Sequence, residues 1–141
     1  MTISRRTMLL AMTAASLHAD EAQDVLDLFT QMASALSAAD AGRFMEACDR
    51  NLPGYQVLEM NVDALVAEAT VTSAVDVVSD NGDAMHRTVE LDWFLQIVQL
   101  EAAIGSTERR SRIHCQLMRE KKRWRITSLD PISFFAPPKP R

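Results

Sequence analysis

The stretch Met85–Leu100, MHRTVELDWFLQIVQL, decides the fold of this chain. Five consecutive odd positions within it are apolar: Val89, Leu91, Trp93, Leu95 and Ile97. The even positions between them are mostly polar, with Glu90, Asp92 and Gln96 among them. Because successive side chains of a strand point to opposite faces, this alternation predicts one long β-strand with a single buried face.

Three further strands are predicted around this one. Their ranges are Thr70–Val78, Glu108–Arg119 and Trp124–Leu129. Ser79–Asp83, with Asn-Gly at its centre, predicts the turn that precedes the long strand. Glu120–Arg123 predicts a tight turn before the last strand, and Glu101–Thr107 is a looser connection that contains a glycine.

Helices are predicted before all of these strands. Apolar residues at helical spacing predict amphipathic helices over 21–38 and 41–50, the second capped by Asp40. A short helical turn at 55–60 and a last helix at 62–69, capped by Asn61, follow. No helix can bury its apolar stripe alone, so the helices are expected to pack on the sheet. The sequence therefore predicts an α+β fold, with three helices packed on a curved antiparallel sheet.

The turns predict how the strands pair. A turn at 121–122 sets Ile126 opposite Leu117 and Ser128 opposite Cys115, and a loop centred near residue 104 sets Trp93 opposite Cys115. The face toward the helices then carries Leu91, Trp93, Leu95, Ile113, Cys115, Leu117, Trp124 and Ile126. The other face carries Glu90, Asp92, Gln96, Arg112, His114, Gln116, Arg125 and Thr127. A slip of one residue would bury the charged set, which makes the two faces a firmer prediction than the registers.

Charge is divided unevenly along the chain, whose 141 residues suit a single domain. Residues 20–101 contain 16 acidic and three basic residues, whereas residues 102–141 contain ten basic and three acidic ones. Attraction between these two parts within the fold is one interpretation, and a functional anion site is the other. The net charge of −4 and the lack of a nucleic-acid-binding motif argue against nucleic acid as a partner.

Residues 1–19 have the organisation of a removable signal peptide. Arg5 and Arg6 precede the mostly apolar stretch Thr7–Leu17, and Ala19 stands just before Asp20 at a plausible cleavage point. The paired arginines also suit the twin-arginine route, and both routes remain open. The apolar stretch is shorter than the ~20 residues that cross a bilayer, so no stable membrane anchor is expected. The predicted location is periplasmic or secreted.

Two cysteines, Cys48 and Cys115, would meet an oxidising compartment after export. A disulfide between them is possible, and two separate buried thiols are the alternative. Neither cysteine has the spacing of a redox or zinc motif, and no other ligand motif for a metal is present. No metal and no cofactor are therefore predicted.

The end of the chain resembles a known family. Trp124–Pro131 and Phe134–Pro138 resemble the ending of exported bacterial members of the nuclear transport factor 2-like (cystatin-like) superfamily, and Pro53–Tyr55 and the 61–69 helix are similar too. The resemblance covers residues 20–138 and implies a cone whose curved sheet wraps the helices around a pocket at its open end. The domain is expected at 20–136, with 137–141 as a proline-rich tail.

The side chains expected to line that pocket are nearly all apolar. They are Phe29, Phe44, Tyr55, Leu65, Trp93, Cys115 and Trp124. Catalysis would need an inward acid or histidine with a shifted pKa and donors for an oxyanion. His86, His114, Glu90 and Asp92 all fall on outward positions, so no catalytic residue is assigned.

Family members often dimerise through the outer face of the sheet. In this chain that face would present Glu90, Asp92, Arg112, His114 and Arg125, whose opposite charges suit a two-fold axis. The first hypothesis is therefore a non-catalytic exported module that forms a homodimer or binds a small apolar ligand. One alternative is an isomerase- or dehydratase-type enzyme with a pocket between helices and sheet. The other is an anion-binding module built on Arg109, Arg110, Arg112 and Arg125.

Overall fold

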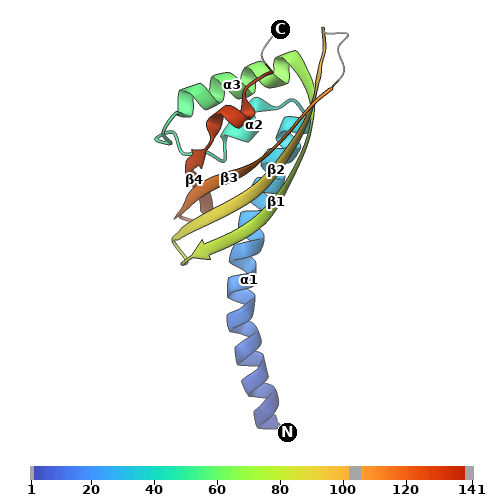
Figure 1. Cartoon of the computed structure of the whole chain (residues 1–141). Helices are drawn as coiled ribbons and strands as arrows, with labels where there is room; N and C mark the ends of the chain where they lie inside the picture. Colours follow the sequence, from blue (N-terminus) through green and yellow to red (C-terminus); the bar gives the residue numbers. More distant parts are fainter. Residues whose placement is uncertain (1, 102–105, 139–141) are drawn as a thin grey trace.

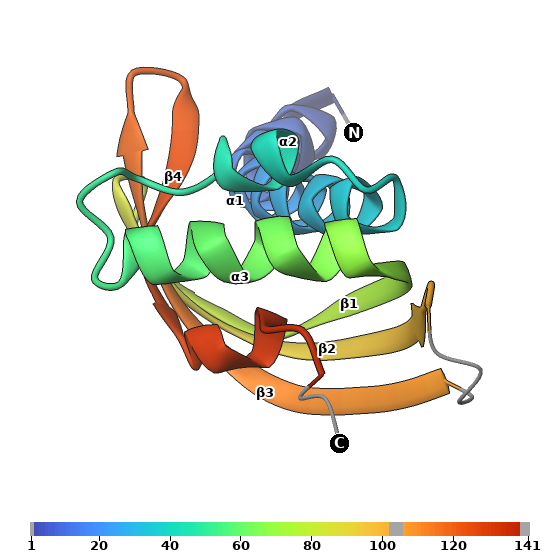
Figure 2. The same ribbon diagram turned by 90° about the horizontal axis from the view of Figure 1, so that it is seen from above.

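The computed structural model describes residues 2–101 and 106–138, with side chains described from residue 20 onward. The elements in chain order are α1 (Thr2–Ser37), α2 (Ala41–Met45), α3 (Tyr55–Glu68), β1 (Ala69–Gly82), β2 (His86–Gln99), β3 (Ser106–Glu120), β4 (Arg123–Asp130) and the 3-10 helix η1 (Ile132–Phe135). The strands form one antiparallel sheet in the order β1-β2-β3-β4. The three helices lie against one face of this curved sheet (Figures 1 and 2), which confirms the predicted α+β architecture.

The long strand is confirmed as β2, and its odd face is the centre of the core. Five of its inward side chains are fully buried: Val89, Leu91, Trp93, Leu95 and Ile97. The inward residues predicted on β3 and β4 are buried as well. The alternation along the strands therefore sorted the two faces correctly.

Two of the predicted registers are wrong. Trp93 pairs with Ser111 rather than Cys115, a shift of four residues that leaves every side chain on its predicted face. Ile126 does lie opposite Leu117, but a bulge places Leu129, not Ser128, opposite Cys115. The extra residue in β4 returns Leu129 to the core, where it is 4% exposed.

The helices differ from the prediction in length. α1 continues through residues 2–20, and its N-terminal part projects beyond the sheet (Figure 1). α2 keeps its predicted cap, where the Asp40 carboxylate accepts a bond from the Arg43 backbone N–H at 3.0 Å, but it ends at Met45. The turn at 55–60 and the helix at 62–69 form one helix, α3, because its buried residues Leu58, Val62 and Leu65 continue one apolar stripe. No helix among the described residues is long and apolar enough to span a membrane.

The turn before β2 lies later than predicted. Residues 79–82 belong to β1, after a bulge near Val77, and the chain reverses at residues 83–85. The Asp83 carboxylate accepts bonds from the backbone N–H groups of Met85 and His86, each at 2.8 Å. These two bonds stabilise the turn and lower the pKa of Asp83.

Two segments outside the sheet cover the free edge of β4 and part of the sheet's inner face. The backbone after α2 runs along the free edge of β4, where Ile126 exchanges 2.9 Å bonds with Ala47 and Asp49. After β4, η1 folds back over the sheet beside α3 (Figure 2) and buries Phe134 and Phe135. Within the loop expected at 101–107, residues 102–105 fall outside the described part, as do residues 139–141 of the expected tail.

Candidate functional site

The expected pocket inside the cone contains an aromatic cluster. The Trp93 ring lies 6.4 Å from Phe29 and 6.3 Å from Phe44, measured between ring centroids. Its indole N–H donates to the Ser73 hydroxyl at 2.8 Å. Phe135, which the sequence interpretation did not assign to the pocket, lies 5.0 Å from Trp93 and 5.2 Å from Phe44. Phe29, Phe44 and Trp93 are therefore core residues, and Phe44 and Trp93 pack against the C-terminal segment.

Arg109 holds this C-terminal segment in place. One of its terminal guanidinium nitrogens donates to the backbone carbonyl oxygens of Phe134 at 2.7 Å and Ala136 at 2.6 Å. Burial lowers the pKa of Arg109. Arg109 therefore stabilises the closure of the cone rather than contributing to a surface cluster of arginines.

Ionisable groups are scarce in the interior. Among the described side chains, no buried residue carries a polar or charged side chain. Cys48 and Cys115 are buried free thiols, so the structure has the unpaired alternative. Burial raises the pKa of Cys48 to about 12. Burial, and then the nearby Cys48, raise the pKa of Cys115. The same described residues contain no group of three or more potential metal ligands.

The outer face of the sheet carries most of the predicted dimer residues. Glu90 lies 3.8 Å from His114 and 3.9 Å from Arg112. Asp92 binds Arg110 at 3.1 Å, and this hydrogen bond raises the pKa of Arg110. The acids stand on β2 and the bases on the adjacent β3, so the divided charge of the sequence meets at this boundary.

Arg125 does not belong to this group. It lies opposite Met118 near the end of the β3–β4 hairpin and pairs with Glu120 at 3.4 Å. With Arg109 on backbone carbonyls and Arg110 and Arg112 on carboxylates, the four arginines of the anion-binding hypothesis do not converge. That form of the hypothesis is wrong, because each guanidinium already has its own acceptor.

A second charged cluster, which the sequence interpretation missed, lies near the start of β2, on the face toward the helices. Arg87 pairs with Asp80 at 2.5 Å and with Glu21 of α1 at 3.4 Å. The three side chains are 10–18% exposed. Arg87 interrupts the apolar alternation of the opening stretch, and this interruption is the signal that could have revealed the cluster. The Arg87–Glu21 pair attaches α1 to the sheet, and the Arg87–Asp80 pair joins β2 to β1.

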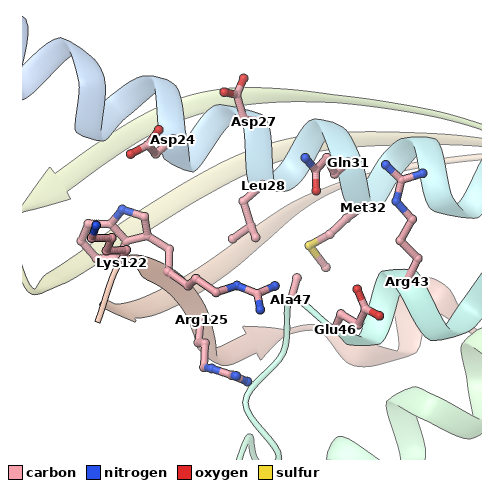
Figure 3. Close-up of a pocket in the computed structure, with 12 residues that line it drawn as sticks. Asp24, Asp27, Leu28, Gln31, Met32, Arg43, Glu46, Ala47, Lys122 and Arg125 are labelled. Atoms are coloured by element: carbon pink, nitrogen blue, oxygen red, sulfur yellow. The ribbon is translucent and has the colours of Figure 1, made fainter. Parts of the chain in front are cut away.

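Two surface clefts flank the β3–β4 hairpin. The first, which we call the hairpin cleft, has a volume of about 370 Å³ and lies between α1, α2 and the hairpin (Figure 3). The second has a volume of about 460 Å³ and lies on the other side of Glu46, Arg123 and Arg125, which line both. Of the seven predicted pocket residues, Trp124 lines the first cleft and Tyr55 the second. The other five line neither.

Comparison with known proteins places the fold. Neither a scan against protein-family models nor a search of curated proteins finds a match. A putative scytalone dehydratase from Novosphingobium aromaticivorans superposes with a TM-score of 0.70 at 5% identity, over 82% of this chain and 85% of that one. An "NTF-2 like protein of unknown function" from Shewanella oneidensis superposes with a TM-score of 0.62 at 10% identity, over 77% of this chain and 96% of that one. A hexachlorocyclohexane dehydrochlorinase superposes with a TM-score of 0.65 at 12% identity, over 79% of this chain and 84% of that one.

These structures show which fold the chain has. It is an α+β cone of the nuclear transport factor 2-like kind, as the resemblance predicted. Both enzymes and proteins of unknown function share this fold, so the likeness carries no activity to this chain.

Proposed function

We propose that this chain is a non-catalytic module that assembles as a homodimer through the outer face of its sheet. The observation that carries the proposal is the separation of charge on that face. Glu90 and Asp92 stand on β2, and Arg110, Arg112 and His114 stand on β3. A face with acids on one strand and bases on the next is complementary to a copy of itself.

The two-fold axis that would satisfy this face runs parallel to the strands, between β2 and β3. Such an axis places β2 of one copy over β3 of its partner, so that acids oppose bases twice. Phe94, half-buried on the same face, pairs with Arg110 and would lose its remaining exposure in the dimer. Within one copy the Arg112 and Arg110 side chains are 54% and 67% exposed, so solvent screens the pairs that they form with Glu90 and Asp92. In the proposed dimer, each carboxylate would also face a base of the partner copy.

The composition of the interior supports a non-catalytic role. Isomerase or dehydratase chemistry needs a general acid or base in a dry cavity, with its pKa near the working pH. The described core offers only the thiols of Cys48 and Cys115, whose raised pKa values keep them protonated near neutral pH. Trp93 is fully buried, so a small apolar ligand would reach it only by displacing side chains such as Phe135.

We further propose that the module acts outside the cytoplasm, in the periplasm or as a secreted protein, after removal of residues 1–19. The support is the sequence pattern of those residues. Mass spectrometry of the protein recovered from the periplasm and medium of a bacterial host tests this. The expected species has the mass of a chain that begins at Asp20. A full-length species found only in the cytoplasm would contradict export.

The dimer is tested by sedimentation velocity on the full chain and two double variants. An all-basic face (Glu90→Arg with Asp92→Arg) and an all-acidic face (Arg110→Glu with Arg112→Glu) should each weaken self-association by about tenfold or more, because like charges then face each other. An equal mixture of the two variants should restore the dimer as a heterodimer.

The matched control changes charge elsewhere, with Glu59→Arg and Asp63→Arg on exposed positions of α3. This control should sediment as the unmodified chain does. The proposal fails if the unmodified chain is monomeric at millimolar concentration, or if the mixed variants stay monomeric.

A further inference from the structure

The hairpin cleft has an apolar floor beneath a charged rim. Leu28 and Met32 point into it from α1 (Figure 3), and Ala47 and Trp124 complete the apolar lining. Trp124 is only 6% exposed, and the Arg119 guanidinium lies 5.7 Å from the centre of its ring. This floor offers a rigid apolar contact for the body of a ligand. The volume of about 370 Å³ is within the range of roughly 300–1,000 Å³ that small-molecule sites occupy.

Among the described side chains, three cations without a carboxylate partner line the cleft, with Lys122 and Arg123 on the hairpin side and Arg43 on α2 at the far end (Figure 3). Within the described residues, no carboxylate lies within 4.0 Å of the charged nitrogens of Arg43, Lys122 or Arg123. The indole N–H of Trp124 is buried and has no hydrogen-bond partner in this part of the chain. This N–H lies beneath the cleft surface, so it reports on a ligand above the Trp124 ring rather than binding it directly. The Lys122 and Arg123 cations on the hairpin side suit a ligand with a carboxylate.

The opposite side of the cleft is acidic. Asp24 and Asp27 line this side from α1, and both side chains are exposed. A ligand that carries only negative charge would meet repulsion from these carboxylates, which disfavours nucleic acid and other polyanions. A positive group on the ligand would instead be attracted to this side, as an ion pair at the cleft mouth.

We infer that the hairpin cleft binds a small zwitterionic ligand with an apolar body, of the class of a short peptide with free ends. Its carboxylate would lie against Arg123 and Lys122, beside the buried Trp124 ring. Its ammonium group would lie near Asp24, and its side chains would cover Leu28 and Met32. The site is separate from the outer sheet face, so binding there does not depend on dimerisation.

The two tryptophans provide a direct assay on the full, ¹⁵N-labelled chain. The Trp93 indole N–H is bonded to Ser73 inside the core and serves as an internal reference. The probe is the dipeptide alanyl-phenylalanine, compared with its N-acetyl form, which lacks the ammonium group, and its C-terminal amide, which lacks the carboxylate. The Trp124 indole signal should shift saturably with the zwitterion, the Trp93 signal should stay in place, and both capped forms should bind more weakly.

Charge variants assign each end of the probe. Arg123→Gln should weaken the zwitterion and the N-acetyl form about fivefold and leave the amide unchanged, because only the first two carry the carboxylate. Asp24→Asn should weaken the zwitterion and the amide but not the N-acetyl form. Lys121→Gln, a neighbouring base that does not line the cleft, is the matched control and should change nothing.

Three results would overturn the inference. The first is no saturable shift of Trp124 with the zwitterion at millimolar concentrations. The second is equal or tighter binding of either capped form. The third is a loss with Lys121→Gln as large as that with Arg123→Gln, which would indicate nonspecific attraction to the basic hairpin.

Discussion

Replacing Phe135 by alanine would reopen the interior of the cone. Its ring is fully buried and lies 5.0 Å from Trp93, 5.2 Å from Phe44 and 5.1 Å from Phe134. Truncation of a buried phenylalanine costs about 3–5 kcal/mol, since apolar burial is lost and a cavity remains. The three aromatic neighbours place Phe135 in the upper half of that range, because each such pair adds about 0.5–1.5 kcal/mol beyond burial.

Urea unfolding followed by tryptophan fluorescence measures this loss. With a denaturant slope of about 2 kcal/mol per molar, a loss of about 4 kcal/mol lowers the midpoint by about 2 M. Phe135→Leu keeps most of the side-chain volume and should lower the midpoint by well under half as much. Its midpoint can still be measured if the alanine variant is largely unfolded. The cavity in either variant is apolar, so benzene should raise the midpoint of the variants but not that of the unmodified chain.

Phe94→Ala is the matched control for this series. Phe94 is the same residue type on the adjacent strand position to Trp93, but it lies half-buried on the outer face. Measured at a concentration at which the chain is monomeric, its truncation should cost about 1 kcal/mol, in proportion to the smaller apolar area that it buries. If Phe135→Ala and Phe94→Ala shift the midpoint equally, the C-terminal segment is not part of the core, and the account of a closed cone is wrong.

Three further predictions concern the Arg87 ion pairs and the two cysteines. Arg87→Met should lower the free energy of unfolding by about 3–5 kcal/mol, measured by urea titration, because it leaves Asp80 and Glu21 without their shared cation; a loss under about 1 kcal/mol would refute this. Cys48 and Cys115 should resist thiol reagents in the folded chain at pH 8 and react fully in urea, and fast reaction of the folded chain would contradict their burial. Burial raises the pKa of Cys48 in the folded state, so the protonated thiol contributes fully to stability below the ordinary thiol pKa. That contribution is lost as the pH rises toward about 12. In urea titrations at alkaline pH, Cys48→Ala should therefore lose less stability than the unmodified chain.

The sequence by itself determined which side chains face inward. The alternation along 85–100 placed Trp93 in the core and Glu90 and Asp92 outside, and the structure agrees. This succeeds because the period of two is a local property of the extended backbone and does not depend on the partner strand. The order of helices and strands could be predicted for the same reason, because the cap and turn residues that mark each boundary lie next to it in the chain.

Only the tertiary structure decided the registers and the contents of the cone. The pairing of Trp93 with Ser111 depends on how the loop before β3 closes, and the extra residue in β4 moves Leu129 opposite Cys115. The approach of Phe135 to Trp93 brings together residues more than 40 positions apart, and no periodic pattern encodes such a contact. The hairpin cleft arises in the same way. Asp24 and Arg123 are almost a hundred residues apart in the sequence, and they share a site only because the helices pack on the sheet beside the hairpin.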